Sequence, residues 1–288
     1  MSAKVWIDGA PMDAAEARVP VFDRGFLYGD SVYEVLRTFS GRPFGLGPHL
    51  DRLERSAAGL EMALPPRATI ERAIADTLAA ASEPDAYIRV IVTRGAGEIG
   101  LDPAMADRPR LIVMVRPVHL PPPSAYEDGV EVAVVGRSRS SPTPGGSVDP
   151  TVKSGNYLVS VLAVAEAKRR GAYEAILTDQ VGRASEGSSS NFFIARGARI
   201  CTPPVSVGLL EGITRRTVID LCREAGMSVD ELPLWPIDLK RADEAFLTSS
   251  VRGVLPIVRV DGQPIASGRP GPLTRQVMAL YDRATSAA

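Results

Sequence analysis

The sequence is poor in the residues that build disulfide frameworks, metal sites and hydrolytic triads. It has only two cysteines among 288 residues, Cys201 and Cys222, so we expect no disulfide framework. Its two histidines, His49 and His119, are too few for a histidine-rich metal site. They also leave a Ser-His-Asp triad with few possible bases, and the Gly-x-Ser-x-Gly elbow of many hydrolases is absent. A histidine-rich metal site and a Ser-His-Asp triad are therefore disfavoured.

Strong net charge and long apolar runs are also missing. A formal net charge of −1 gives no reason to expect a nucleic acid or an anionic membrane as a partner. No apolar run approaches the length of a membrane span, and the first residues lack the apolar core of a signal peptide. We therefore expect a cytoplasmic protein. Its 288 residues suffice for one large domain or two ordinary ones, and its hydrophobic content of 45% supports a substantial core.

Hydrophobic periodicity predicts an α+β fold, with strands and a helix pair in the first 120 residues. Alternation of apolar and polar residues indicates strands, and apolar residues at helical spacing indicate amphipathic helices. The strands are expected at Lys4–Asp8, Ser31–Phe39, Tyr87–Thr93 and Leu111–Val115, and the helices at His49–Leu60 and Ala68–Ala81.

Three consecutive prolines, Pro121 to Pro123, indicate a domain boundary because such a run is stiff and cannot lie inside a sheet. We predict a small N-terminal domain over 1–120, a linker over 121–125 and a larger C-terminal domain over 126–288. Strands are expected there at Val130–Val135, Glu174–Thr178, Asn191–Ala195, Ala245–Thr248 and Ile257–Val260, and helices at Asn156–Arg170, Thr214–Glu224 and Thr274–Arg283.

Three segments offer, in order, the groups that hold and activate pyridoxal phosphate. In Lys153-Ser-Gly-Asn-Tyr157, the lysine can form an imine with an aldehyde. In Glu186-Gly-Ser-Ser-Ser-Asn191, the carboxylate can keep a pyridine nitrogen protonated. In Glu211-Gly-Ile-Thr-Arg215, the start of a helix can present N–H groups to a phosphate.

Each of these residues also has an ordinary structural interpretation. Lys153 could be a solvated loop lysine, and Glu186 a turn carboxylate. Thr214 could be a simple helix N-cap. Arg52 could bind a phosphate through two N–H groups, or pair on the surface with an acid of its own helix.

A second group of residues offers contacts for a substrate or for the phosphate. Tyr87 and Arg89 share one strand face, which suits a substrate carboxylate but is also typical of a surface pair on an edge strand. The hydroxyl-rich segment Thr248-Ser-Ser250 either binds phosphate or only forms a turn.

Taken together and in this order, the motifs resemble those of the class IV aminotransferases, the fold-type IV pyridoxal-phosphate enzymes. The most specific motif is Glu186-Gly-Ser-Ser-Ser-Asn-Phe-Phe193. Leu210–Arg215 and Ala242–Leu247 support it, and the resemblance runs from Phe22 to Pro272, nearly the whole chain.

This resemblance implies a cofactor, a fold and a set of roles. The cofactor is pyridoxal 5'-phosphate, with Lys153 as its covalent anchor and as the catalytic base. The fold has two domains with the cofactor between them, and the C-terminal domain has a β-barrel-like core. The family also implies a homodimer. The implied cofactor-binding residues are Arg52, Lys153, Tyr157, Glu186, Ile213, Thr214 and Ser250.

Within the family, the substrate residues look like those of the branched-chain amino-acid aminotransferases. They are Tyr28, Tyr33, Arg37, Tyr87, Arg89 and Val251. The implied reaction moves an amino group from an aliphatic L-amino acid to a 2-oxo acid such as 2-oxoglutarate. D-amino-acid aminotransferases are similar at Tyr33-Glu-Val and Thr93-Arg-Gly95, but their Arg-x-His pair is missing from 97–102. An aminodeoxychorismate lyase releasing pyruvate and a non-catalytic pyridoxal-phosphate carrier are the remaining alternatives.

Overall fold

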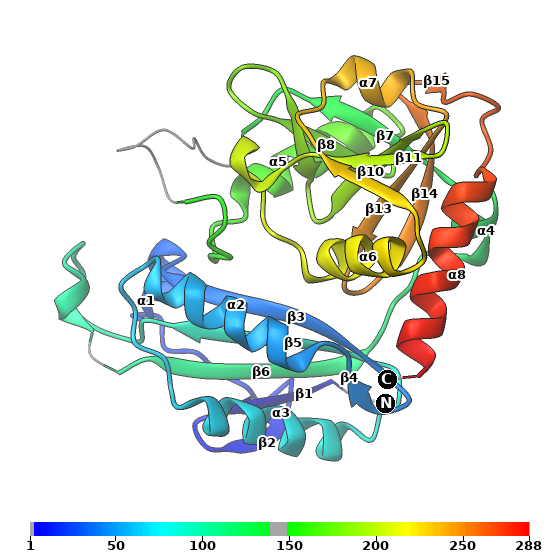
Figure 1. Ribbon diagram of the computed structural model, residues 1–288. Helices are drawn as coiled ribbons and strands as arrows, with labels where there is room; N and C mark the ends of the chain where they lie inside the picture. Colours follow the sequence, from blue (N-terminus) through cyan, green and yellow to red (C-terminus); the bar gives the residue numbers. More distant parts are fainter. Residues whose placement is uncertain (1–2, 107, 139–148, 288) are drawn as a thin grey trace. The chain divides into compact units, whose positions relative to one another are not determined.

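The computed structural model describes residues 3–106, 108–138 and 149–287, which fall into two compact units (Figure 1). The first unit holds the described residues up to His119 together with the short segment Val152–Asn156. The second holds the described residues from Leu120 to Thr151 and from Tyr157 onward. The segment predicted as a linker, 121–125, belongs to the second unit, where its last proline begins a short helix.

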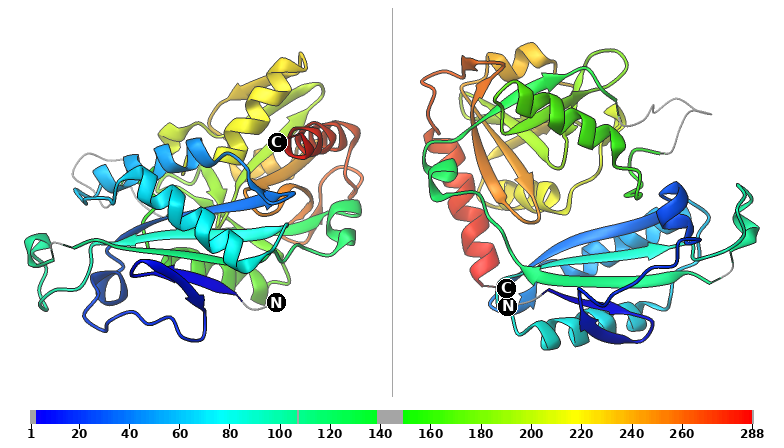
Figure 2. Two further views of the ribbon diagram at one scale, coloured as in Figure 1. Left: turned by 90° about the horizontal axis from the view of Figure 1, so that it is seen from below. Right: turned by 180° about the vertical axis from the view of Figure 1, so that it is seen from behind.

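A six-stranded antiparallel sheet forms the first unit, in the order β2-β1-β6-β5-β3-β4. Helices α2 and α3 cover one of its faces, as the left view of Figure 2 shows. The strands are β1 Lys4–Ile7, β2 Ala10–Asp13, β3 Ser31–Phe39, β4 Arg42–Pro43, β5 Ala86–Thr93 and β6 Arg110–Pro117, and the helices are α1 Arg24–Tyr28, α2 Leu46–Ala58 and α3 Arg67–Ala81.

The alternation along β3 separates the core of this unit from a second, more polar sheet face. Val32 and Leu36 are fully buried and pack in one cluster with Leu50 and Leu53 of α2. Because successive strand side chains point to opposite faces, Tyr33 lies on the face away from these helices. That face therefore offers the side chains of β3 and its neighbours to a site.

A nine-stranded mixed sheet forms the second unit, in the order β12-β11-β10-β13-β14-β7-β8-β9, with β15 paired to β14. The β7–β8, β7–β14 and β11–β12 pairs are parallel and the others antiparallel. The strands are β7 Val130–Val135, β8 Glu174–Thr178, β9 Ala184–Gly187, β10 Asn191–Arg196, β11 Arg199–Thr202, β12 Ser228–Glu231, β13 Glu244–Ser249, β14 Gly253–Val260 and β15 Gln263–Pro264.

This sheet curls, because β9 returns to contact β10 and one apolar cluster takes side chains from β7 to β11, β13 and β14. Helix α5 covers β7 and β8 through Ala163 and Ala167, while α6 and α8 pack on each other and on the sheet. The expected α+β class with a barrel-like core is confirmed. The helices are α4 Pro123–Glu127, α5 Leu158–Arg169, α6 Ile213–Glu224, α7 Pro236–Lys240 and α8 Pro272–Ser286, with 3-10 turns at Pro103–Met105 and Val205–Val207.

The described part of the chain has neither a membrane-spanning helix nor a cluster of metal ligands. None of its helices is both long and apolar enough to cross a bilayer. The same residues contain no group of three His, Cys, Asp or Glu side chains placed to hold a metal ion.

Candidate active site

Lys153 lies in the short segment that returns to the first unit and runs beside β3. Its carbonyl oxygen accepts a 3.0 Å hydrogen bond from the Tyr33 N–H, and its own N–H donates at 3.1 Å to Oγ of Ser56 in α2. The residue is only 9% exposed. The interpretation of Lys153 as a solvated loop lysine is therefore wrong.

The side chain of Lys153 reaches the aromatic ring of Tyr33. Its Nζ lies 4.5 Å from the ring centroid, and the guanidinium carbon of Arg89 lies 4.3 Å from the same centroid. The Nε of Arg89 is buried and has no hydrogen-bond partner among the described residues. An arginine donor that is buried without an acceptor is costly, which suits a site for a carboxylate.

Arg52 belongs to a buried cluster with Glu34 and His49. Its Nε and Nη2 each donate to the Glu34 carboxylate at 2.7 Å. Glu34 is fully buried; burial alone would raise its pKa, but Arg52 and His49 lower that pKa to about 2. The ionised carboxylate can only accept, so His49 Nδ1 donates to it at 2.8 Å, while burial lowers the pKa of His49.

The pairing of Arg52 differs from the surface interpretation, because its acid comes from β3 and not from its own helix. Neither Glu34 nor His49 was predicted from the sequence to belong to the site. The sequence does contain a sign of this pair. Glu34 lies between Val32 and Leu36 on the core-facing side of the predicted strand, and a buried acid needs a buried cation as partner.

The other expected substrate residues of β3 and β5 lie on the sheet face of Tyr33. Arg37 stands directly opposite Tyr87 in the ladder, and its Nε and Nη2 each donate to Asp85 at 2.9 Å. Arg116 stacks on the Tyr87 ring. Since β5 lies between β3 and β6, the interpretation of Tyr87 and Arg89 as an edge-strand pair is wrong.

Tyr28 lies apart from these strands, at the end of α1. Its hydroxyl accepts a 3.2 Å hydrogen bond from the Gly100 N–H, and the Arg24 guanidinium lies 5.1 Å from its ring centroid. Arg24 also donates to the carbonyls of Gly100 and Leu101. Tyr28 is therefore anchored to the loop between β5 and β6.

In the second unit, Glu186 lies in β9 and not in a turn, so the turn interpretation is wrong. It is 3% exposed, and its Oε2 accepts a 3.1 Å hydrogen bond from the Leu210 N–H. Asn191, from the same motif, donates at 3.0 Å to the Leu210 carbonyl. At Gly212 an added Cβ would lie 2.0 Å from the Asn191 Oδ1. The Glu186–Asn191 and Leu210–Arg215 motifs thus contact each other directly.

Helix α6 begins at this contact with no side-chain cap. Its N-cap is Gly212, so the interpretation of Thr214 as the N-cap is wrong, and Ile213 and Thr214 contribute free first-turn N–H groups with the positive end of the helix dipole. Thr248 stands opposite Asn191, and its Oγ1 is buried without a partner among the described residues. These donors fit a phosphate.

A second buried ion pair, missed in the sequence, lies beside this helix-start region. Glu174 accepts hydrogen bonds from Ser189 N–H at 2.8 Å, from the Ser190 hydroxyl at 2.8 Å and from Arg252. Burial alone would raise the pKa of Glu174, but Arg252, the Ser189 N–H and the Ser190 hydroxyl lower it. Arg252 also holds the Ser249 hydroxyl at 3.0 Å. The pair therefore ties the serine loop to the turn that carries Ser250 and Val251.

The expected residues divide between the two units. The first-unit group is Arg52, Lys153, Tyr28, Tyr33, Arg37, Tyr87 and Arg89, and the second-unit group is Tyr157, Glu186, Ile213, Thr214, Ser250 and Val251. Tyr157 is half-buried and directly precedes α5.

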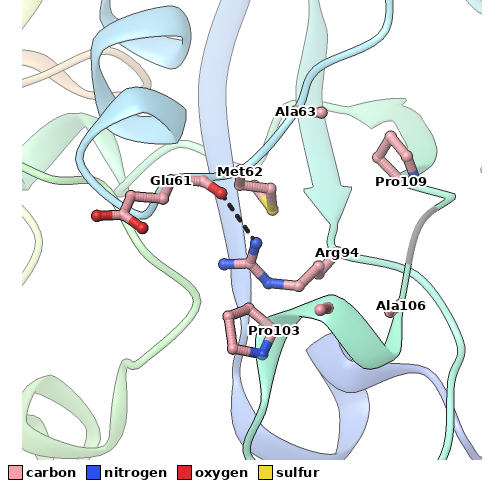
Figure 3. A pocket seen from close by; sticks show the side chains of 8 residues that line it. Glu61, Met62, Ala63, Arg94, Pro103, Ala106 and Pro109 are labelled. Carbon is pink, nitrogen blue, oxygen red and sulfur yellow. Dashed lines mark hydrogen bonds between the residues drawn. The ribbon is translucent and has the colours of Figure 1, made fainter.

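A cavity of about 330 Å³ in the first unit contains none of these residues (Figure 3). Arg94 lines it, and its three guanidinium nitrogens donate to the carbonyls of Leu60 and Glu61 and to Asp30. All three guanidinium nitrogens of Arg94 are therefore already held by protein oxygens. Its lining is Glu61, Met62, Ala63, Arg94, Pro103, Ala104, Ala106 and Pro109.

Comparison with known proteins gives a consistent set of relatives. The family described as "Amino-transferase class IV" matches residues 31–260. A Methanocaldococcus jannaschii protein named "Putative branched-chain-amino-acid aminotransferase" is 39% identical over 96% of this chain and 95% of its own length. The D-alanine aminotransferase of Bacillus licheniformis is 33% identical over 95% of this chain and 94% of its own length.

Solved structures of branched-chain aminotransferases are also similar to this chain. The Escherichia coli branched-chain amino acid aminotransferase superimposes with a TM-score of 0.94 at 28% identity, covering 100% of this chain and 96% of its own. The branched-chain aminotransferase of the archaeon Thermoproteus uzoniensis, solved with norvaline, has a TM-score of 0.88 at 30% identity, covering 100% and 96%.

Proposed function

Because this chain belongs to the class IV aminotransferases, which use pyridoxal 5'-phosphate, we propose that it transfers the amino group of an aliphatic L-amino acid to a 2-oxo acid such as 2-oxoglutarate. The observation that carries this proposal is the buried Nε of Arg89, which has no hydrogen-bond partner within the described part of the chain. It lies on the sheet face that also presents the rings of Tyr33 and Tyr87. A carboxylate would satisfy that donor, and the aromatic rings would accept an apolar side chain.

The residues that would hold the cofactor fit its chemistry. Lys153 would anchor it covalently, and Glu186 would keep the pyridine nitrogen protonated. Ile213, Thr214 and Ser250 would bind the phosphate with Arg52, and Tyr157 would contact the ring. When bound, pyridoxal phosphate supplies an aldehyde that captures the amino group and a ring that takes up electrons.

Lys153 is also the base of the proposed reaction. Its Nζ would take the proton from Cα of the amino acid and hold it until it is returned to the cofactor-side carbon. The hydrogen bonds of its backbone to Tyr33 and Ser56 support this role, since they fix the position from which the amine acts.

The substrate contacts follow from the polar sheet face. Arg89 would bind the carboxylate with Tyr87, and Tyr28, Tyr33 and Val251 would surround the side chain. The Arg37 guanidinium is held by Asp85, so it is fixed in place as a further contact. The aromatic rings on this face would pack against an aliphatic side chain, which favours such a substrate.

Two further proposals concern organisation. We propose the domains 1–120 and 126–288, joined at 121–125.

We also propose a homodimer. The first unit exposes the apolar side chains Phe22, Phe26, Ile99 and Leu101, and such side chains are common at interfaces. Light scattering of the purified protein tests the dimer, and a monomer at micromolar concentration contradicts it.

A second candidate is transamination of D-amino acids, favoured by the similarity to the Bacillus licheniformis D-alanine aminotransferase. Mixing the cofactor-loaded protein with L-leucine, L-valine or D-alanine and following the visible absorbance separates the two. A faster change with L-leucine supports the proposal, and a dominant D-alanine response overturns it. Pyruvate released from aminodeoxychorismate without a 2-oxo acid would instead indicate a lyase.

A further inference from the structure

We propose that Tyr33 is a positioning residue whose aromatic ring holds Lys153 and Arg89 in fixed relation to each other. Tyr33 is 2% exposed. The Arg89 guanidinium carbon and the Lys153 Nζ both lie within 4.5 Å of its ring centroid. This inference rests on the proposed function, in which Arg89 binds the substrate carboxylate and the neutral amine of Lys153 moves the proton.

The two cations reach the ring from the two chain segments that flank β3. On one side, Arg89 stands opposite Val35 in β5, diagonal to Tyr33 on the same sheet face. On the other side, Lys153 lies beside Tyr33, whose N–H donates to its carbonyl oxygen, and Ser154 bridges to Val32. Tyr33 is therefore the side chain between the two groups in the first unit.

The physical reason for an aromatic residue at this position is the negative face of its π system. While the Lys153 amine is protonated, it and Arg89 repel each other, and a ring that attracts both reduces the cost of their approach. Arg89 keeps its charge in every state, so its attraction to the ring persists when the cofactor is bound. The attraction comes from the ring and not from the hydroxyl. A phenylalanine should therefore replace Tyr33 in this role, and an aliphatic side chain should not.

The arrangement has a consequence for catalysis. A carboxylate bound at Arg89 is placed at a fixed distance from the amine of Lys153, so the same ring serves substrate affinity and proton transfer. Removing the ring should weaken carboxylate binding and slow the proton transfer together. If Tyr33 contributed only apolar packing, its removal would weaken the binding of a charged acid and of its uncharged amide equally.

The test compares Tyr33→Leu, which removes the ring, with Tyr33→Phe, which keeps it. Because Tyr33 is buried, Tyr33→Leu also leaves a cavity that destabilises the unit. Leu36→Ala is the matched control, since Leu36 is a fully buried residue of the same strand on the opposite, core-facing side. All variants are cofactor-loaded and are studied well below their melting temperatures.

The first readout is equilibrium binding, measured by calorimetry, of 4-methylpentanoate and of its uncharged amide. The ratio of the two affinities isolates the carboxylate contribution. We expect Tyr33→Leu to lower this ratio about tenfold, within the range of cation–π energies, and Tyr33→Phe and Leu36→Ala to change it less than about twofold. Arg89→Met should remove the preference for the acid altogether.

The second readout is the rate of the first half-reaction at saturating L-leucine. It should fall about tenfold or more in Tyr33→Leu and stay within about threefold in Tyr33→Phe. Equal losses of acid and amide binding in Tyr33→Leu, or an equally slow Tyr33→Phe, overturn the proposal. Wild-type protein that transaminates no amino acid contradicts the proposed function instead, so the two failures are distinguishable.

Discussion

The backbone N–H of Lys153 donates a 3.1 Å hydrogen bond to Oγ of Ser56. Ser56 lies one turn beyond Arg52 on α2, and both are buried together with His49 on the same helix face. This buried polar face of α2 therefore fixes the backbone of Lys153 and the guanidinium of Arg52 from a single rigid element.

Replacing Ser56 by alanine should leave the Lys153 N–H buried without an acceptor. We expect a loss of about 1–3 kcal/mol in the free energy of unfolding, and a lower rate of the first half-reaction because the lysine is less well fixed. Urea unfolding and single-turnover absorbance measure the two effects. Thr77→Ala, which removes a buried hydroxyl of α3 in the same unit, should affect stability alone; an equally slow Thr77→Ala would argue against a specific role of Ser56.

Glu34 should make the stability of the protein depend on acid pH. Its pKa is lowered from the ordinary value of 4.5 to about 2 in the folded state, so its stabilisation is present above about pH 4.5 and is lost as the pH falls toward 2. We expect Glu34→Gln to be less stable than wild type at pH 7 by a few kcal/mol. The difference should shrink between pH 4.5 and 2.

Urea unfolding of both proteins across this pH range measures the difference. The exposed acid Glu71, which pairs with Arg67, provides the control: Glu71→Gln should differ from wild type by less than about 1 kcal/mol at every pH. A Glu34→Gln difference that stays constant down to pH 2 would mean that folding does not lower the pKa of Glu34.

Arg52→Ala should weaken cofactor binding more than it slows the chemistry. A charge-assisted contact to a phosphate contributes roughly 1.5–3 kcal/mol, so the affinity should fall by about one to two orders of magnitude. Titrating the cofactor-free protein with pyridoxal phosphate measures this. Arg55→Ala, an exposed arginine on the same helix, should leave the affinity unchanged. Unchanged affinity in Arg52→Ala would limit that residue to the ion pair with Glu34.

Much of the fold could be predicted because its strands have clear periodicity. β3 has the expected bounds, Ser31–Phe39, since its alternation of apolar and polar residues ends at the Ser40-Gly41 turn. β9 was missed because Ala184–Gly187 is small, polar and buried, and has no apolar alternation. The local sequence does not predict such a strand, because it forms through pairing with β8 and contact with β10.

The site was predictable in its residue types but not in its partners. Lys153 and Glu186 were expected from motifs, whereas the pairing of Arg52 with Glu34 joins positions 18 residues apart. The return of Val152–Asn156 to the first unit depends on long-range contacts that spacing cannot reveal. Glu174 and Arg252, which are 78 residues apart, were missed for the same reason.

Gly212 should tolerate no side chain, for a steric and not a conformational reason. Its φ of −68° and ψ of 133° suit any residue, but a Cβ would lie 2.0 Å from the Asn191 Oδ1. We expect Gly212→Ala to cost about 1–3 kcal/mol of stability and to weaken pyridoxal phosphate binding, because the start of α6 must shift.

The double variant Gly212→Ala with Asn191→Ala tests this origin, since it removes the clashing atom. It should recover part of the loss, so the two changes together cost less than the sum of the single ones. Gly136→Ala is the control, because an added Cβ there has no neighbour within 4 Å and should leave stability within about 0.5 kcal/mol of wild type. Additive losses in the double variant would mean that the Asn191 side chain moves aside freely, and that the close contact between the two motifs does not fix the start of α6.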